Sequence, residues 1–224
     1  MRRLLRKYIY FIFWAIVLLG LVGILFNIPL LDYISKPLLM PLLILAVHLR
    51  SSNTRGKTKI QGALLLSFFG DILLMFEDKG TWFFISGLAC FLFAHVMYIA
   101  YFRQLSRNND SLIKDYPYIT IGIIGYAGLL LALLYPVLGD LRVPVIIYAC
   151  IISIMLFYAF KVPYKVSRFV RYLFISGAIF FVLSDSLLAI NKFYLPFAAA
   201  GFLIRITYCL AQFFIAKGYI KKKY

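Results

Sequence analysis

Apolar runs of about 20 residues follow one another along almost the whole chain of 224 residues. A run of that length is what an α-helix needs to cross the hydrocarbon part of a bilayer. Hydrophobic residues make up 64% of the sequence and charged residues 14%, whereas a soluble domain carries roughly 25% charged residues. The sequence therefore predicts an all-α integral membrane protein whose apolar segments face lipid or one another.

The runs divide into eight expected transmembrane helices within a single polytopic membrane domain, residues 1–224. The N-terminal "MRRLLRKY" precedes an apolar run that is too long for the core of a signal peptide and lacks a small-x-small cleavage site, so we interpret it as a retained first helix. The predicted spans are 8–26, 31–49, 60–76, 81–102, 116–137, 143–160, 172–190 and 196–216.

Lysine and arginine predict the orientation of these spans. With eight spans, 19 basic residues fall on the side of both termini and only three on the opposite side. Cytoplasmic segments of membrane proteins are enriched in Lys and Arg, so we expect both termini in the cytoplasm, and in a bacterium the inner membrane. The net charge of +16 is explained by these clusters and by contacts with anionic lipids, and nucleic acid is not expected as a partner.

Two carboxylates interrupt the apolar runs, Asp71 in "GDILLM" and Asp185 in "SDSLLA". A charge inside the bilayer costs a few kcal/mol, so such residues normally face the protein interior and mark functional sites. Lys36 and Arg205 are the two basic residues inside spans, which balances the two acids. Because "GDILLM" and "SDSLLA" match as [GS]-D-x-L-L, we also predict two four-helix halves of the same orientation, with both aspartates at similar depth beside a common cavity.

Helical spacing adds polar candidates to this cavity. His95 and Tyr98 share one face of the fourth span, and Arg205, Tyr208 and Gln212 share one face of the eighth. We predict that these five residues and Lys36 bind substrate. A purely structural role, with Lys36 and Arg205 neutralising the acids, remains open. Gly122, Gly125 and Gly128 of the fifth span favour close helix packing.

Several stretches, taken together and in order, resemble the YhhN family of eight-helix membrane proteins, which includes the animal lysoplasmalogenases. They are "KPLLMPLL", "GDILLM", "SGLACFLFAHVMY", "YAC…M", "GAIFFVLSDSLLAINKF" and "YCLAQFFIAKG". The resemblance implies an ether hydrolase that cleaves the vinyl-ether bond of a lysophospholipid, a lysoplasmalogen, to a fatty aldehyde and glycerophospho-ethanolamine or -choline. It also implies that Asp71 and Asp185 are catalytic and that no metal or organic cofactor takes part.

The chemistry of a vinyl ether agrees with a pair of carboxyl groups. Acid delivers a proton to the β-carbon, and the resulting oxocarbenium ion is captured by water, much as in glycoside hydrolysis. We expect one aspartate to protonate carbon and the other to stabilise the cation and position water, and the order stays open. Lys36 and Arg205 could hold the lipid phosphate, and His95 or Tyr98 could orient water.

Other functions fit parts of the pattern. Paired intramembrane charges also occur in transporters and proton-coupled carriers, and a hydrolase could act on another lysolipid. A zinc hydrolase is disfavoured because the chain has only two histidines, His48 and His95, and its three cysteines lack metal-binding spacing. No GxSxG motif supports a serine nucleophile.

Overall fold

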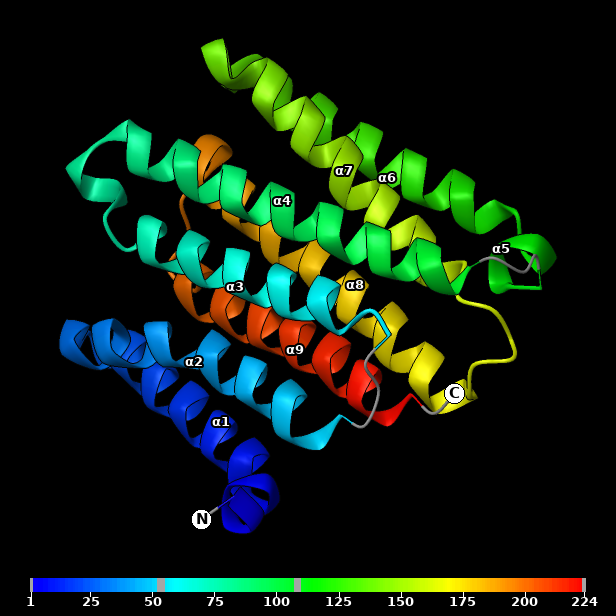
Figure 1. Ribbon diagram of the computed structural model, residues 1–224. Coiled ribbons are helices and arrows are strands. Elements are labelled where there is room, and N and C mark those ends of the chain that lie inside the picture. Colours follow the sequence, from blue (N-terminus) through cyan, green and yellow to red (C-terminus); the bar gives the residue numbers. More distant parts are fainter. Residues whose placement is uncertain (1, 52–54, 107–109, 223–224) are drawn as a thin grey trace. The chain divides into compact units, whose positions relative to one another are not determined.

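The structure is a computed structural model of the chain, and it describes residues 2–51, 55–106 and 110–222. Throughout these ranges every regular element is helical, which confirms the predicted all-α class (Figure 1). The α-helices are α1 Arg2–Leu25, α2 Pro29–Arg50, α3 Lys57–Leu74, α4 Thr81–Leu105, α5 Leu112–Asp115, α6 Tyr118–Leu134, α7 Arg142–Phe160, α8 Arg168–Ala189 and α9 Ala200–Lys221. The short elements are the 3₁₀ turns η1 Glu77–Lys79, η2 Tyr135–Val137 and η3 Gly139–Leu141 and the π-helical turn η4 Ile190–Tyr194.

Each predicted span corresponds to one long helix, with ends that differ by up to six residues. In the described part of the chain, seven helices are long and apolar enough to cross a membrane. The exception among the eight is α3, whose 18 residues include Lys57, Lys59 and Asp71. By length and composition these seven helices are candidate membrane spans, and the predicted eight crossings stay a prediction.

The chain divides into two compact units, Met1–Tyr98 with Ala216–Tyr224 and Ile99–Ile215, so that α4 and α9 each contribute to both. In the first unit, α1 and α2 pack as a hairpin. Gly23 lets the chain turn closely there, because a Cβ on Gly23 would lie 2.8 Å from the Cβ of Leu31. The helix α2 in turn packs against α3 (Figure 1).

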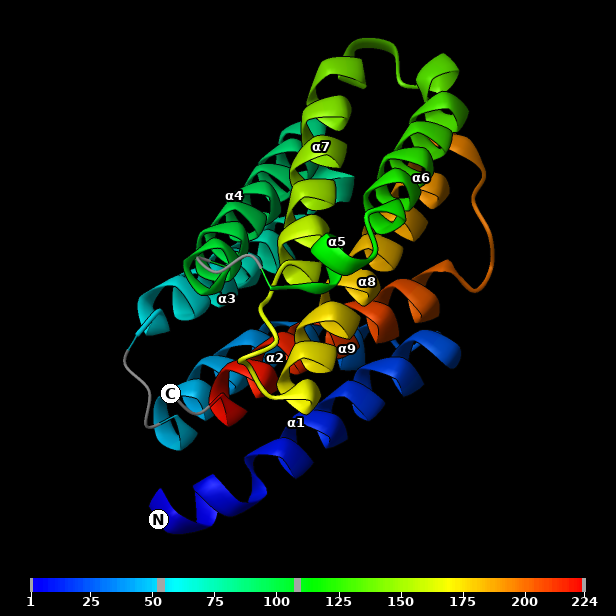
Figure 2. The same cartoon turned by 90° about the vertical axis from the view of Figure 1, so that its right-hand side faces the viewer.

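In the second unit, α7 packs against both α6 and α8 (Figure 2). Gly177 on α8 allows a close approach of α9, since a Cβ there would lie 3.1 Å from the backbone oxygen of Ala211. A ring cluster of Tyr101, Phe102 and Phe174 joins the end of α4 to α8, with ring centroids 5.3 to 5.8 Å apart. This packing fixes the helices that carry the candidate site.

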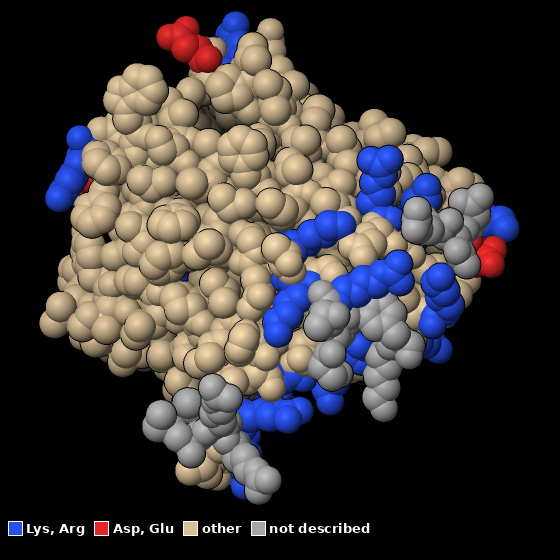
Figure 3. Space-filling view, in the orientation of Figure 1, with Lys and Arg blue, Asp and Glu red and all other residues tan. Residues whose placement is uncertain are grey.

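Large apolar side chains are exposed along the helices, for example Leu129 of α6 at 73% exposure. On the face shown in Figure 3, most Lys and Arg side chains gather at the lower right, and a broad uncharged surface lies beside them. Some basic residues used in the orientation argument, such as Arg107 and Lys223, lie outside the described residues. Apolar helix surfaces of this kind are stable where lipid is the solvent, and the protein is a multi-pass integral membrane protein.

Candidate active site

Asp185 lies on α8, one turn before this helix gives way to the π-helical turn η4. Its side chain is half-buried, and both of its neighbours in sequence are buried serines. The hydroxyl of Ser184 donates to the backbone oxygen of Ile204 on α9 at 3.2 Å, and that of Ser186 donates to the backbone oxygen of Val182 at 2.7 Å. Both serine protons are therefore used within the protein, and Asp185 is the acidic group of this turn.

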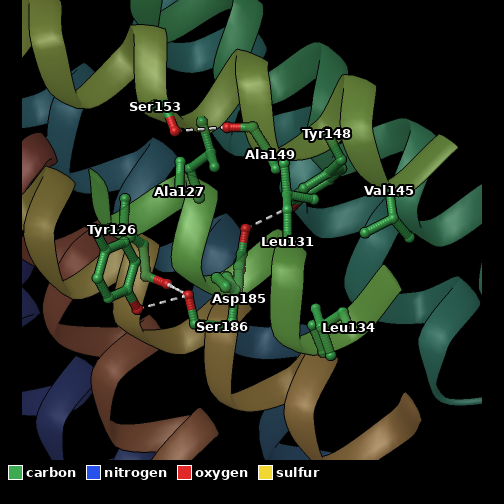
Figure 4. Close-up of a pocket in the computed structure, with 14 residues that line it drawn as sticks. Tyr126, Ala127, Leu131, Leu134, Val145, Tyr148, Ala149, Ser153, Asp185 and Ser186 are labelled. Atoms are coloured by element: carbon green, nitrogen blue, oxygen red, sulfur yellow. Dashed lines mark hydrogen bonds between the residues drawn. The ribbon is translucent and has the colours of Figure 1, made fainter. Parts of the chain in front are cut away.

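The carboxyl group of Asp185 borders a pocket between α6, α7 and α8 (Figure 4). The cavity itself is small, about 50 Å³, and it opens to the outside. Its lining has the character of small-molecule sites, which are mostly apolar with a few placed polar groups. The lining residues are Tyr126, Ala127, Leu130, Leu131, Leu134, Val145, Tyr148, Ala149, Ile152, Ser153, Val182, Asp185, Ser186 and Ala189.

Tyr148 on α7 forms a hydrogen bond with Asp185. Its phenol donates to Oδ2 of Asp185 over 2.6 Å, which joins α7 to α8 across the wall of the pocket. Hydroxyl donors approach ionised carboxylates to about 2.5–2.7 Å, whereas neutral pairs are usually longer. In this contact the phenol of Tyr148 is the donor and Oδ2 of Asp185 is the acceptor.

The other hydroxyl groups of the pocket bond in a different way. Tyr126 on α6 donates to Oγ of Ser186 at 3.0 Å, and Ser153 on α7 donates to the backbone oxygen of Ala149 at 2.7 Å. These contacts join neutral groups and satisfy their protons. Among the described residues that line the pocket, Asp185 is the one side chain that carries a carboxyl group.

Asp71 lies in the first unit on α3, with 3% of its side chain exposed. The residue before it, Gly70, lies against the ring of Phe91 on α4, since a Cβ on Gly70 would be 2.7 Å from that ring. Gly87 of α4 completes the contact, because its Cβ would lie 2.9 Å from the side chain of Leu74. The close contact of α3 with α4 thus fixes the turn that carries Asp71.

The remaining predicted site residues are distributed over three helices. His95 and Tyr98 on α4 are fully buried, and Lys36 on α2 is half-buried. Arg205, Tyr208 and Gln212 on α9 are buried, and the ring of Tyr208 contacts Phe181 edge-on at 5.7 Å. None of these six residues belongs to the lining of the pocket beside Asp185.

The predicted roles of all eight residues, and the common cavity of the two aspartates, stay predictions. Sequence reasoning did not assign Tyr148, Tyr126 or Ser186 to the site. Tyr148 stands in the quoted "YAC…M", and Ser186 stands in "SDSLLA", but a chain with 17 tyrosines gives no local sign of which phenol meets an acid. In the described part of the chain, His, Cys, Asp and Glu form no group of three that could hold a metal ion.

Known proteins are similar to this chain over most of its length. Human lysoplasmalogenase TMEM86A is 30% identical over 171 residues, which cover 74% of this chain and 67% of that protein. Pig lysoplasmalogenase TMEM86B is 30% identical over 179 residues, 79% of this chain and 71% of that protein. The lysoplasmalogenase of Mycobacterium tuberculosis is 30% identical over 182 residues, 80% of this chain and 67% of that protein.

No solved structure matches the chain significantly. The sequence model of the YhhN family matches residues 31–219, a range that contains both aspartates and every residue of the pocket. The chain belongs to the YhhN family.

Proposed function

We propose that this protein is a lysoplasmalogenase, which hydrolyses the vinyl-ether bond of a lysoplasmalogen to a fatty aldehyde and a glycerophospho-ethanolamine or -choline. Its relatives in the family carry that name. The observation that carries the proposal is Asp185, a carboxyl group with a phenol donor at 2.6 Å, on the wall of an otherwise mostly apolar pocket. In the proposal the hydrocarbon chain of the substrate lies along the apolar wall, and Asp185 supplies a carboxyl group next to the vinyl ether.

The reaction adds one water molecule across the ether. A carboxylic acid gives its proton to the β-carbon, the double bond supplies the electrons of the new C–H bond, and the ether oxygen shares the positive charge. Water attacks the α-carbon while a carboxylate accepts its proton, and the hemiacetal then breaks into aldehyde and glycerol hydroxyl. In our proposal Asp71 and Asp185 are the two carboxyl groups of this sequence.

The rest of the substrate is assigned to the other predicted residues. Lys36 and Arg205 bind the phosphate of the head group, because a fixed cation is the natural partner of that anion. His95, Tyr98, Tyr208 and Gln212 position the head group and the attacking water. The alkenyl chain lies along the leucine side chains of α6, next to Asp185.

The orientation in the membrane is also part of the proposal. The 19 to three distribution of basic residues supports eight crossings with both termini in the cytoplasm. In this arrangement α3 is the eighth crossing. Its charged residues Lys57 and Lys59 lie in its first turn, where long side chains can reach the lipid head groups.

Aldehyde release by the purified protein in detergent tests the proposed activity. The substrate is a vinyl-ether lysophosphatidylethanolamine, and the saturated-ether and acyl analogues are the controls for bond type. We expect aldehyde from the vinyl ether alone, and a loss on the order of 10²–10⁴-fold in kcat for Asp71→Asn and for Asp185→Asn. A folded wild-type protein that releases no aldehyde, or two single variants that keep full activity, would contradict the proposal.

A further inference from the structure

We propose that α6 is the gate through which the alkenyl chain of the lysolipid enters the pocket beside Asp185 from the bilayer. The inference rests on the proposed function and deepens it, because it names the route of the substrate. It starts from the size of the cavity, which is about 50 Å³. Sites that hold a small organic molecule measure about 300–1,000 Å³. One wall of this pocket must therefore move before a hydrocarbon chain can enter.

Of the three helices around the pocket, α6 is the one with the fewest buried residues. Two of its 17 residues, Ile123 and Leu134, are buried, compared with five of the 19 residues of α7 and ten of the 22 residues of α8. The helix α8 is also held by its close contact with α9 at Gly177. Elements with few buried contacts open at the lowest cost in free energy, so α6 is the wall that moves.

The bilayer lowers the cost of this movement. In water, a helix that leaves its neighbours exposes apolar surface, whereas in a bilayer lipid chains take the place of those neighbours. The helix α6 packs on α7 and contacts the turn η4 (Figure 2). Its side chains in the pocket lining are Tyr126, Ala127, Leu130, Leu131 and Leu134. When α6 moves outward, the hydrocarbon chain of the substrate can lie against the same leucine side chains.

One hydrogen bond fastens α6 over the pocket, and we call it the latch. The phenol of Tyr126 donates to Oγ of Ser186 on α8 at 3.0 Å (Figure 4). Among the described residues it is the only hydrogen bond that a side chain of α6 forms with another helix. The proton of Ser186 goes to the backbone oxygen of Val182, so opening of the latch leaves the hydroxyl of Ser186 with an acceptor. A single bond between neutral groups contributes little enough to open and close repeatedly.

The glycines of α6 supply the flexibility that this movement needs. Gly122, Gly125 and Gly128 are exposed, and no atom of the described chain lies within 4 Å of a Cβ placed on any of them. Their spacing puts them on the side of α6 opposite to the residues that line the pocket. Contact with another described helix does not require glycine there, and each glycine makes the helix easier to distort than alanine would. We infer that α6 bends at these positions.

The test measures how often the pocket opens, in protein reconstituted in lipid vesicles and without Cys90, Cys150 and Cys209. A single cysteine replaces Val182, which is buried and lines the pocket, and an apolar maleimide dissolved in the bilayer labels it. When opening and closing are faster than the reaction, the labelling rate follows the open fraction. Leu183→Cys is the matched control, since Leu183 is the next residue of α8 and is exposed outside the pocket.

Loss of the latch should speed the labelling of Val182→Cys. Tyr126→Phe, or Ser186→Ala from the side of α8, should raise the rate about two- to tenfold, which is the change in population that one neutral hydrogen bond supports. Tyr118→Phe is the matched control, because Tyr118 is an exposed phenol of α6 outside the pocket lining. None of these three variants should change the labelling of Leu183→Cys.

A stiffer α6 should have the opposite effect. Gly125→Ala should slow the labelling of Val182→Cys about two- to fivefold, because alanine favours the regular helix. With a smaller open fraction, KM for the vinyl-ether lysolipid should rise by the same factor. Gly62→Ala on α3 is the matched control, since a Cβ there would meet Met97 at an ordinary 3.9 Å, and it should change neither the labelling rate nor KM.

The outcomes separate the two proposals. A folded wild-type protein that releases no aldehyde ends the proposed function, whereas the labelling rates still decide whether α6 moves. Equal labelling of Val182→Cys in the wild-type, Tyr126→Phe and Gly125→Ala backgrounds overturns the role of α6 as a gate. If Gly125→Ala dissociates an oligomer in detergent, the glycines serve contact between copies of the chain, and their role in bending is overturned.

Discussion

Asp185 owes its chemistry to its immediate neighbours. The serines on either side bond to backbone oxygens, and the phenol of Tyr148 donates to one carboxyl oxygen. Most of the other residues that line the pocket are leucine, valine, isoleucine and alanine. In such a setting electrostatic contacts are stronger than in water, because the effective dielectric is low. If the substrate reacts beside Asp185, as we propose, this setting strengthens the attraction between its carboxylate and the cation that forms on the substrate.

The small residues of the pocket wall make a prediction about the hydrocarbon chain. Ala127 of α6 lines the pocket, and Ala127→Phe would fill part of the space beside Asp185 (Figure 4). We expect this variant to raise KM for a long-chain lysoplasmalogen by about tenfold, with a smaller effect on a short-chain analogue, since burial of each CH₂ contributes about 0.8 kcal/mol.

Ala132→Phe is the control for this change, because Ala132 is an exposed residue of the same helix outside the pocket lining. Kinetics over a series of chain lengths provides the measurement. If Ala127→Phe raised KM equally for all chain lengths, the hydrocarbon chain of the substrate would bind elsewhere.

The sequence alone identifies Asp185 but not Tyr148. An acid inside an apolar run is visible because its desolvation is costly, whatever the fold. Tyr148 is separated from Asp185 by 37 positions, and its hydrogen bond depends on how α7 and α8 pack. Tyrosines are also common at membrane interfaces, so a tyrosine in a span carries little information until the helices are placed.

At the scale of helices, a glycine can mark the point where two helices come closest. Gly177 of α8 lies against Ile215 and the backbone oxygen of Ala211 on α9, whereas no atom of the described chain lies within 4 Å of a Cβ placed on Gly122, Gly125 or Gly128. The prediction that the three glycines of α6 allow close packing is wrong for the described chain. The spacing of these three glycines places them on one side of α6, but it does not show whether another helix packs against that side.

This contrast predicts the effect of alanine at each position. A Cβ at Gly177 would lie 2.7 Å from Ile215 Cγ1 and 3.1 Å from a backbone oxygen that cannot move aside easily. Gly177→Ala should lower the free energy of unfolding by about 1–3 kcal/mol, as overpacking does. Gly125→Ala should leave it unchanged or raise it by up to about 1 kcal/mol, because alanine favours the helix.

Thermal or denaturant unfolding in detergent compares the two glycine variants under identical conditions. A Gly177→Ala protein as stable as the Gly125→Ala protein would show that α8 and α9 are not in this close contact.

The connection between α7 and α8 makes a pH-dependent prediction. The phenol of Tyr164 donates a hydrogen bond to Asp115, the last residue of α5, and this hydrogen bond raises the pKa of Tyr164 to about 12. Because the pKa of Tyr164 is raised in the folded protein, the contact stabilises the folded state at pH values below the ordinary tyrosine pKa of about 10. This stabilisation is lost as the pH rises through about 12.

Tyrosine labelled with ¹³C on the ring allows the titration of Tyr164 to be followed by NMR. Asp115→Asn should lower its pKa towards the ordinary value, and Tyr164→Phe assigns the signal. A midpoint near the ordinary value in the wild-type protein would contradict the contact.

At the scale of the whole molecule, length and hydropathy determine most of what could be predicted. All eight apolar runs are helices, because backbone groups in a bilayer must bond within their own segment. Predicted helix ends differ from the observed ones by up to six residues, most where the helix continues past the apolar run into charged residues, as at Arg2 in α1 and Lys221 in α9. The short helix α5 was missed because four residues carry no periodic signal.

The proposed orientation can be tested on loops from opposite sides. In a variant without Cys90, Cys150 and Cys209, single cysteines replace Lys165 between α7 and α8 and Asp78 in η1, which are both exposed. A membrane-impermeant maleimide should label Asp78→Cys from outside in intact cells and Lys165→Cys only after the membrane is opened. The reverse pattern, or labelling of both from one side, would contradict the eight-span topology with cytoplasmic termini.

The central claim is that this protein cleaves a vinyl ether by protonating carbon, and hydrolysis in D₂O tests it most directly. Proton delivery to the β-carbon leaves one solvent-derived deuterium on the carbon next to the aldehyde group. We predict that mass spectrometry at early times finds one deuterium at that position of the enzymatic aldehyde. The control is unlabelled aldehyde incubated in D₂O with Asp185→Asn protein, and its deuterium content should be lower. An enzymatic aldehyde with no more deuterium than this control would contradict carbon protonation, and with it the proposed roles of Asp71 and Asp185.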